Sequence, residues 1–376
     1  MKKTTSNKKP SLKKTIKALS NRWFITAFSG MAQGLFCTLI AGTILAQIAG
    51  WIGDNYVGKT LATIASMAKS LMGAGIGVGI AFALTKNKLL IFSSAVAGFV
   101  GAFADKLVLG AGLSLSLGAP GNPIGAYVVS LLAVELVSFY AGKTKLDIIL
   151  VPLGVMLIAL GGVFVAWPFI KLIDLFASLL VITLSAGEAV KFIVGVFIAV
   201  VMGILLTMPT SSAAIWIAIA SSETALANPV VFAIAGGAAV AGCSAHMIGF
   251  AVTSYRENGF GGLISQGLGT SMLQIPNIMK KPIIMLPEII SSAVSGLVAV
   301  LLDMRCTAAG GGMGTSGLVG LFGVIDANSL YSISPILTVL GIALCLFIIP
   351  AGVSLLVSEI MRKRGVIALG DMSLEN

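Results

Sequence analysis

Residues 148–167 read IILVPLGVMLIALGGVFVAW, a run of twenty residues without a charged side chain. A helix needs about 20 predominantly apolar residues to cross the hydrocarbon core of a bilayer. The strands of a membrane barrel alternate apolar and polar residues, so an unbroken apolar run of this length indicates a helix. The sequence therefore predicts an all-α integral membrane protein.

The rest of the 376-residue chain has the same character. Apolar residues make up 57% of it and charged residues only 10%, and the mean hydropathy is +1.04. Soluble domains carry about 25% charged residues, so the composition excludes an ordinary water-soluble fold. Judged by apolar length, strong membrane segments fall at 23–52, 61–84, 89–104, 124–142, 148–166, 190–208, 229–252, 282–303 and 335–361.

The basic residues indicate how the chain is oriented. The net charge is +10, with lysines crowded before residue 23 and three basic residues at 362–364. Lys and Arg beside membrane segments stay in the cytoplasm, so both termini are predicted to be cytoplasmic. Basic tails can also bind nucleic acid, but beside a membrane span they indicate topology, so no nucleic-acid partner is expected. Nine spans would place the termini on opposite sides. At least one weaker segment must therefore cross, which gives about ten transmembrane helices.

The weaker segments are rich in Gly, Pro, Ser and Thr. They lie at 107–118, 175–187, 211–227, 262–275 and 307–325. Irregular backbone at membrane depth is tolerated only where protein buries it or water wets it, and such re-entrant segments commonly form transport sites. We expect a basic tail at 1–22, a helical scaffold and dimerisation half at 23–187, a substrate-binding half with re-entrant segments at 188–361, and a second tail at 362–376.

Two glycine-rich stretches invite comparison with nucleotide sites. GAGIGVG at 73–79 lies inside an apolar segment with no preceding strand, which favours helix packing. GGGMGTSG at 310–317 lacks the lysine of a phosphate-binding loop. It suits either close helix packing or a helix start with Thr315 and Ser316 as cap and ligand. Met-x-Thr-Ser occurs at 208–211 and again at 313–316, with a related Gly-Thr-Ser between them, which predicts helix starts that point inward.

Ionisable residues inside apolar sequence are costly in a membrane and usually mark function. His246 is the only histidine, and Glu288 follows a proline in apolar sequence. Both are predicted to contact a polar solute, although Glu288 could instead stabilise a helix start. Lys69 and Glu135 lie in first-half spans, where we expect them to neutralise each other. The four cysteines are scattered without a C-x-x-C, so no metal site is expected, and no cofactor is expected either.

Three stretches carry a family resemblance: AGCSAHMIGFAV (241–252), IPNIMKKPIIMLPEIISSAVSG (275–296) and AAGGGMGTSGLVG (308–320). They resemble the EIIC membrane components of bacterial sugar phosphotransferase systems, and in particular the stand-alone branch of perfringolysin-regulator-like proteins. The resemblance covers about residues 20–360. It implies a homodimer with about ten helices per protomer and two re-entrant hairpins. It also implies that His246 and Glu288 bind the sugar. The Gly-x-x-Glu-Pro sequence usual in the family is not evident, and Glu288 follows a proline instead.

The resemblance further implies a separate cytoplasmic EIIB protein that phosphorylates the sugar on arrival. We therefore expect a multi-pass permease subunit of the bacterial cytoplasmic membrane, without a catalytic domain of its own, that moves a sugar or sugar-like solute. The residues expected to bind the substrate are His246, Glu288, Asn277, Thr315 and Ser316. Two alternatives stay open: an ion-coupled or phosphorylation-independent carrier, and a membrane sensor or regulator that has kept the transporter architecture.

Overall fold

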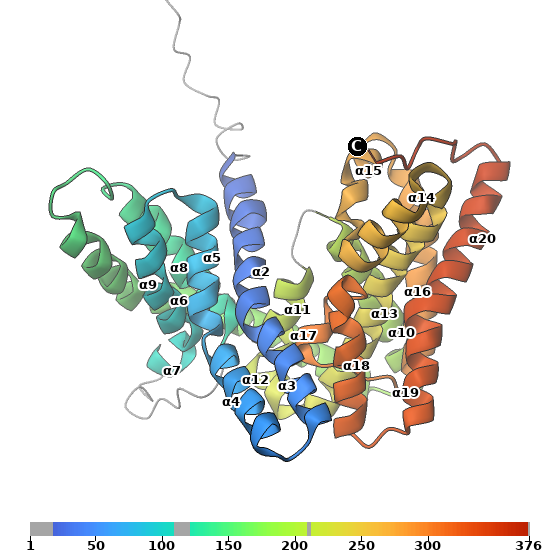
Figure 1. Cartoon of the computed structure of the whole chain (residues 1–376), viewed down its shortest axis with the longest axis horizontal. Helices are drawn as coiled ribbons and strands as arrows, with labels where there is room; N and C mark the ends of the chain where they lie inside the picture. The colour runs from blue at the N-terminus through green and yellow to red at the C-terminus, as the bar shows by residue number, and fades with distance from the viewer. Residues whose placement is uncertain (1–17, 109–120, 209–211, 375–376) are drawn as a thin grey trace, which may run out of the picture.

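The computed structural model describes residues 18–108, 121–208 and 212–374, and within them it holds helices and turns but no strand. The predicted all-α class is confirmed. Figure 1 shows two groups of helices side by side, the first built from the blue-to-green part of the chain and the second from the yellow-to-red part. The start of the first described helix and the C-terminal tail lie at the same end of the molecule (Figure 1).

The first group contains ten helical elements, two of them π-helices within the first span. They are η1 (Asn21–Ala27), α2 (Phe28–Leu35), η2 (Phe36–Ile40), α3 (Ala41–Ile52), α4 (Tyr56–Ser70), α5 (Met72–Leu84), α6 (Lys88–Ala102), α7 (Ala104–Val108), α8 (Pro123–Ser138) and α9 (Asp147–Ser185).

The second group is more fragmented. Its elements are α10 (Glu188–Thr207), α11 (Ser212–Ala220), α12 (Glu223–Ala227), α13 (Pro229–Thr253), α14 (Tyr255–Ile264), η4 (Ser265–Gly269), η5 (Ser271–Gln274), α15 (Ile275–Lys280), η6 (Pro282–Met285), α16 (Leu286–Leu301), α17 (Ala308–Gly311), η7 (Ser316–Leu318), α18 (Val319–Leu330), α19 (Pro335–Gly341), η8 (Ile342–Ile348) and α20 (Ile349–Lys363).

Many of these helices are long and apolar enough to cross a membrane. Among the described residues six qualify, or seven when α4 and α5, which meet at a bend of 53°, count as one broken span. Three further apolar helices, Lys88–Ala102, Pro123–Ser138 and Ser316–Leu330, are shorter. Each of the nine strong segments predicted from apolar length is helical, and the predicted total of about ten is reached only when all three shorter helices also cross.

The segment 175–187 differs from its prediction as a weak or re-entrant piece. It continues α9 as one helix from Asp147 to Ser185. The two charged residues that separate it from the strong segment 148–166 have partners. Lys171 pairs with Glu223 at 2.9 Å, and Asp174 accepts a hydrogen bond from the backbone N–H of Thr224 at 3.0 Å. These contacts tie α9 to α12, so the charges do not require a break in the helix.

The other predicted interruptions are present. Segment 211–227 divides into α11 and α12, and 262–275 passes through a π-helix and a 3-10 helix with extended backbone at Thr270 between them. In 307–325 the four-residue α17 is followed by turns with positive φ at Gly314, Gly317 and Leu318. The chain is thus most broken after residue 188. Most of 107–118 lies outside the described residues.

The glycines at 73–79 pack helices together, which confirms the packing interpretation. A Cβ added at Gly77 on α5 would overlap the carbonyl oxygen of Ser94 on α6. A Cβ at Gly98 of α6 would in turn overlap the carbonyl oxygen of Gly73. Small residues that let two backbones meet are typical of helix contacts in membranes.

The expected pairing of Lys69 with Glu135 is wrong. Arg22 binds Glu135 instead, with Nε 2.6 Å from Oε1, and the indole N–H of Trp23 donates to the same oxygen at 3.1 Å. Lys69 interacts electrostatically with Asp326 on α18. The first span lies against α8 at the level of Glu135, so the guanidinium of Arg22 reaches this carboxylate.

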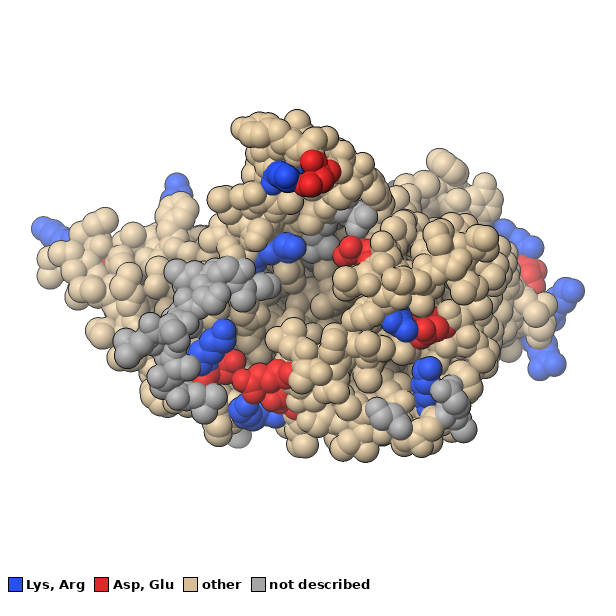
Figure 2. Space-filling view, turned by 90° about the horizontal axis from the view of Figure 1, so that it is seen from below, with Lys and Arg blue, Asp and Glu red and all other residues tan. Residues whose placement is uncertain are grey.

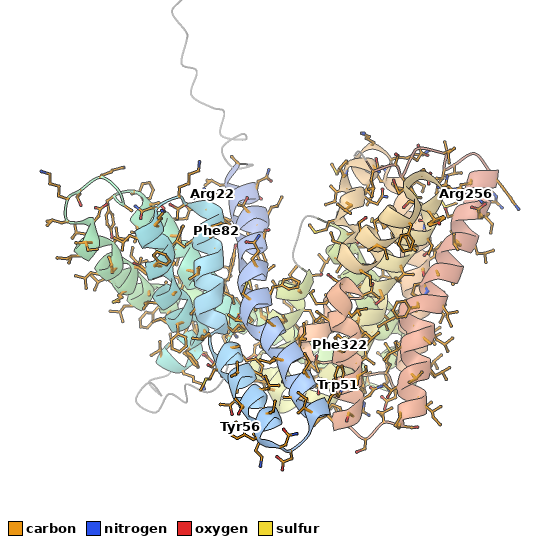
Figure 3. The ribbon with its side chains drawn as sticks, viewed as in Figure 1. Arg22, Trp51, Tyr56, Phe82, Arg256 and Phe322 are labelled. Atoms are coloured by element: carbon orange, nitrogen blue, oxygen red, sulfur yellow. The ribbon has the colours of Figure 1, made fainter. Side chains whose placement is uncertain are left out.

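Contacts across the two groups are concentrated in a few places. The rings of Trp51 on α3 and Phe322 on α18 meet edge to face, with centroids 5.7 Å apart (Figure 3). Ala214 and Ile217 of α11 are buried in the same apolar core as α2, α5 and α8. The chain after residue 188 therefore also contributes to the core of the first group.

On the face seen from below, most of the surface is uncharged, and acidic side chains generally have a basic neighbour (Figure 2).

Candidate functional site

A cavity of about 380 Å³ lies between the two helix groups. One wall comes from the first span. The other comes from three interrupted segments: the start of α11, the η4–η5 junction and the turn before η7. The lining residues are Ile25, Ser29, Ala32, Phe36, Leu206, Ser212, Ala213, Gly269, Thr270, Met272, Met313 and Ser316.

The interrupted segments are fastened to each other at this cavity. Ser316 donates its hydroxyl to the carbonyl oxygen of Gly269 at 2.9 Å, and Thr315 donates to that of Gly267 at 2.6 Å. Thr270 accepts from the backbone N–H of Met272 at 3.2 Å and so begins η5. Two of the three Thr-Ser stretches, 269–271 and 313–316, therefore meet at one point. Residues 209–211 of the third stretch lie outside the described residues.

The predicted capping role of Thr315 is wrong, and the role of Ser316 as a ligand stays a prediction. Their hydroxyls donate to carbonyl oxygens, whereas a cap accepts from a backbone N–H at a helix start. The cap in this stretch is Thr307, whose hydroxyl oxygen accepts from the N–H of Gly310 at 3.3 Å. Ser316 lines the cavity, while Thr315 is fully buried behind it.

The chemistry of the cavity suits a neutral polar solute. Hydroxyl groups of Ser29, Ser212, Thr270 and Ser316 lie among apolar side chains and the ring of Phe36. None of the described residues that line the cavity is charged. Small-molecule sites typically have about 300–1,000 Å³, with mostly apolar walls and a few placed polar groups, so this cavity fits the class in size and in lining.

His246 lies one layer behind the cavity wall. It is completely buried in α13, and its Nδ1 is 2.8 Å from the hydroxyl oxygen of Thr207, which is 2.9 Å from that of Ser271. Leu206 precedes Thr207, and Thr270 and Met272 flank Ser271; all three of these neighbours line the cavity. Gly203 on α10 leaves room for the imidazole, because a Cβ there would stand 2.5 Å from Cδ2. His246 therefore reaches the wall through two hydroxyls, and direct contact with a solute stays a prediction.

Glu288 is also buried and lies apart from the residues that line the cavity. It sits in the first turn of α16, where Thr253 donates to Oε1 at 3.0 Å. Its Oε2 has no hydrogen-bond partner among the described residues. The position in a first turn fits the alternative of a helix-start carboxylate. Its predicted contact with a sugar stays a prediction.

Asn277 holds the C-terminal tail. Its side-chain amide donates to Gln274 at 2.8 Å and to the carbonyl oxygen of Ser373 at 2.9 Å. Gln274 and Asn258 both donate to the carbonyl oxygen of Met372 at 2.9 Å. These amides lie on α14, η5 and α15, so the tail is anchored to the interrupted segment that borders the cavity.

Acidification should loosen this tail. A hydrogen bond from Lys281 holds the pKa of Asp371 below its ordinary value of 3.8, and the N–H of Ala368 acts in the same direction. Because this pKa is lower in the bound tail than in a free one, the ionised carboxylate stabilises the bound tail at pH values above the ordinary pKa. This stabilisation is lost as the pH falls through the lowered pKa. The pair is partly exposed, so its effect is at most about 1 kcal/mol.

The measurement is the mobility of a spin label at position 369, whose side chain is exposed. Asp371→Asn should shift the spectrum toward the mobile form at neutral pH, while Asp54→Asn, in an exposed pair with Lys59, should leave it unchanged. An acid transition that is identical with and without Asp371→Asn would contradict this role.

Several residues of the site gave no signal in the sequence. Ser29 lies in a continuous apolar span, and Thr207 ends an ordinary apolar helix. Ser212 directly follows a Met-x-Thr-Ser stretch, which could have pointed to it. The amides at 258, 266, 274 and 277 stand out in apolar sequence and could have indicated a buried polar cluster.

Comparison with known proteins adds one finding. The family described as "Phosphotransferase system, EIIC" matches residues 25–374, which includes both helix groups, the cavity and the anchored tail. No curated protein and no solved structure matches the chain.

Proposed function

The chain belongs to the EIIC family of the phosphotransferase system as a multi-pass membrane permease component, and we propose that its 380 Å³ cavity binds a sugar or a sugar-like polar solute. The observation that carries this proposal is the uncharged, hydroxyl-lined wall formed by three interrupted segments. Hydroxyls pair with hydroxyls of a sugar, and an aromatic ring such as Phe36 can cover its apolar face. A charged substrate would lack a partner in this lining.

We propose that transport proceeds by movement of the second helix group against the first. The cavity lies between the groups, and the Trp51–Phe322 contact and the Lys69–Asp326 interaction join them. Loss of these contacts would expose the cavity to another side, as alternating access requires. The homodimer and the perfringolysin-regulator-like branch belong to the same proposal and rest on the sequence resemblance.

A separate EIIB protein would phosphorylate the sugar at the cytoplasmic side. The two described ends lie at the same end of the molecule (Figure 1), and Arg256 lies at that end as well (Figure 3). Arg362–Arg364 stand at the end of α20, directly before the C-terminal tail. This distribution of basic residues supports two cytoplasmic termini. The substrate-binding residues proposed are Ser29, Ser212, Thr270 and Ser316 in contact with the sugar. His246, Glu288, Asn277 and Thr315 remain the residues predicted from sequence for the same role.

The test is uptake and phosphorylation of a panel of sugars by membrane vesicles that contain the full chain. Phosphorylated sugar should accumulate only when phosphoenolpyruvate and the cytosolic phosphotransferase proteins are supplied. Accumulation that follows a proton or sodium gradient without those proteins would instead support a phosphorylation-independent carrier. No dependence on any sugar of a broad panel would overturn the proposal.

A further inference from the structure

A row of polar side chains is buried between α13, α16 and α20, apart from the residues that line the cavity. On α16 it consists of Glu288, Ser291, Ser292 and Ser295, whose spacing places them on one helix face. Ser354 and Ser358 of α20 belong to the same row, and all six side chains are at most 1% exposed. An apolar helix contact would have no need of six buried polar groups.

Four of these groups lack a partner among the described residues: Glu288 Oε2 and the hydroxyls of Ser295, Ser354 and Ser358. An unsatisfied buried polar group costs about 1–3 kcal/mol, and a buried carboxylate without a counter-charge costs more. Gly249 of α13 leaves room for them, because a Cβ there would lie 2.7 Å from Ser354 Oγ and 2.8 Å from Glu288 Cγ. The carboxyl group and a free hydroxyl therefore border the same glycine.

Lys363 is exposed at the end of α20, and the other charged and titratable groups of α13 and α20 are engaged elsewhere. His246 of α13 faces Thr207. On α20, Arg362 binds Glu257 of α14 at 2.8 Å, and Glu359 binds Arg256 at 3.0 Å. Cys243 of α13 faces a carbonyl oxygen of α10, and α16 has no other titratable residue. No described residue forms an ion pair with Glu288.

A surface pocket lies next to Thr253. It has about 290 Å³ and is lined by Val252, Thr253, Tyr255, Arg256, Leu263, Leu355 and Glu359. Thr253 is part of its wall and also donates the one side-chain hydrogen bond that Glu288 Oε1 accepts among the described residues. One hydroxyl thus separates the pocket from the buried carboxyl group.

We propose that Glu288 is a proton-binding site, distinct from the sugar cavity and reached from this pocket past Thr253. A proton delivered by a hydronium ion forms an O–H bond at Oε2 and leaves a neutral water molecule behind. The group then carries no charge, and Oε2 becomes a donor for a neighbouring hydroxyl oxygen such as that of Ser354. A metal ion would need several oxygen ligands around it, and the described residues contain no cluster of three metal-binding side chains.

The experiment is infrared difference spectroscopy of the purified full chain between acid and alkaline buffer. The C=O stretch of a protonated carboxyl group should appear in acid and be lost in Glu288→Gln. Glu223→Gln is the matched control, because Glu223 of α12 forms an exposed pair with Lys171 of α9 and takes no part in the buried row. It should keep the band.

Thr253→Val supplies a second test that does not depend on the folding of Glu288→Gln. It should keep the band but move it to higher frequency, because the carbonyl oxygen loses its hydrogen bond. An unchanged band in Glu288→Gln, or no response of the band to Thr253→Val, would overturn the proposal. A change produced by sodium at fixed pH would overturn it in favour of a sodium site. The spectra do not depend on sugar uptake, so failure here is distinguishable from failure of the proposed function.

Discussion

Replacing Ser316 by Trp is expected to reduce sugar binding and uptake below detection while the protein still folds. Ser316 is partly exposed in the turn before η7 and lines the cavity, so a larger side chain there enters the 380 Å³ space. The indole would occupy the volume that the sugar needs. Loss of the hydrogen bond to Gly269 costs about 1 kcal/mol, which a folded membrane domain tolerates.

The measurement is equilibrium binding of the sugar that the uptake panel identifies, together with its uptake. Ser329→Trp is the control, because Ser329 is exposed on α18, the helix that follows η7, and does not line the cavity. Ser316→Ala should weaken binding by at most about tenfold, since it removes one hydrogen bond and adds no volume. Normal binding by Ser316→Trp would show that the sugar binds elsewhere.

The sequence predicted where the second half of the chain is interrupted, but it did not predict which polar side chains meet there. Gly, Pro, Ser and Thr break apolar periodicity locally, so 262–275 and 307–325 could be recognised from composition. Which hydroxyls face the cavity depends on the turn at Gly314–Leu318 and on the extended backbone at Thr270. Those conformations follow from tertiary contacts such as the bond from Thr315 to Gly267.

Charged residues were the hardest to place from sequence. Lys171 and Asp174 reduced the apparent hydropathy near 175–187, although partners on α12 keep the helix continuous. Glu135 was assigned to Lys69, but Arg22 at the start of the first span reaches it. Membrane depth alone shows that a charge needs a partner. The choice among partners depends on helix packing, which apolar length does not encode.

Replacing Gly77 by Val should remove most of the folded protein. Helices in a bilayer gain little from the hydrophobic effect when they meet, so their association depends on close packing. A Cβ at Gly77 would overlap the carbonyl oxygen of Ser94. The Cβ is fixed to the backbone of α5 and the oxygen belongs to the backbone of α6, so neither can rotate away. Overpacking typically costs about 1–3 kcal/mol. Here two rigid helices must separate, so we expect the upper end of that range or more.

The measurement is the yield of monodisperse protein in mild detergent and its thermal transition. Gly161→Val on α9 is the matched control, because a Cβ at Gly161 meets no atom within 4 Å. Both substitutions add the same β-branched side chain to an apolar helix, so the difference between them isolates the contact of α5 with α6. Equal yields and transitions for the two variants would mean that this contact does not hold the first helix group together.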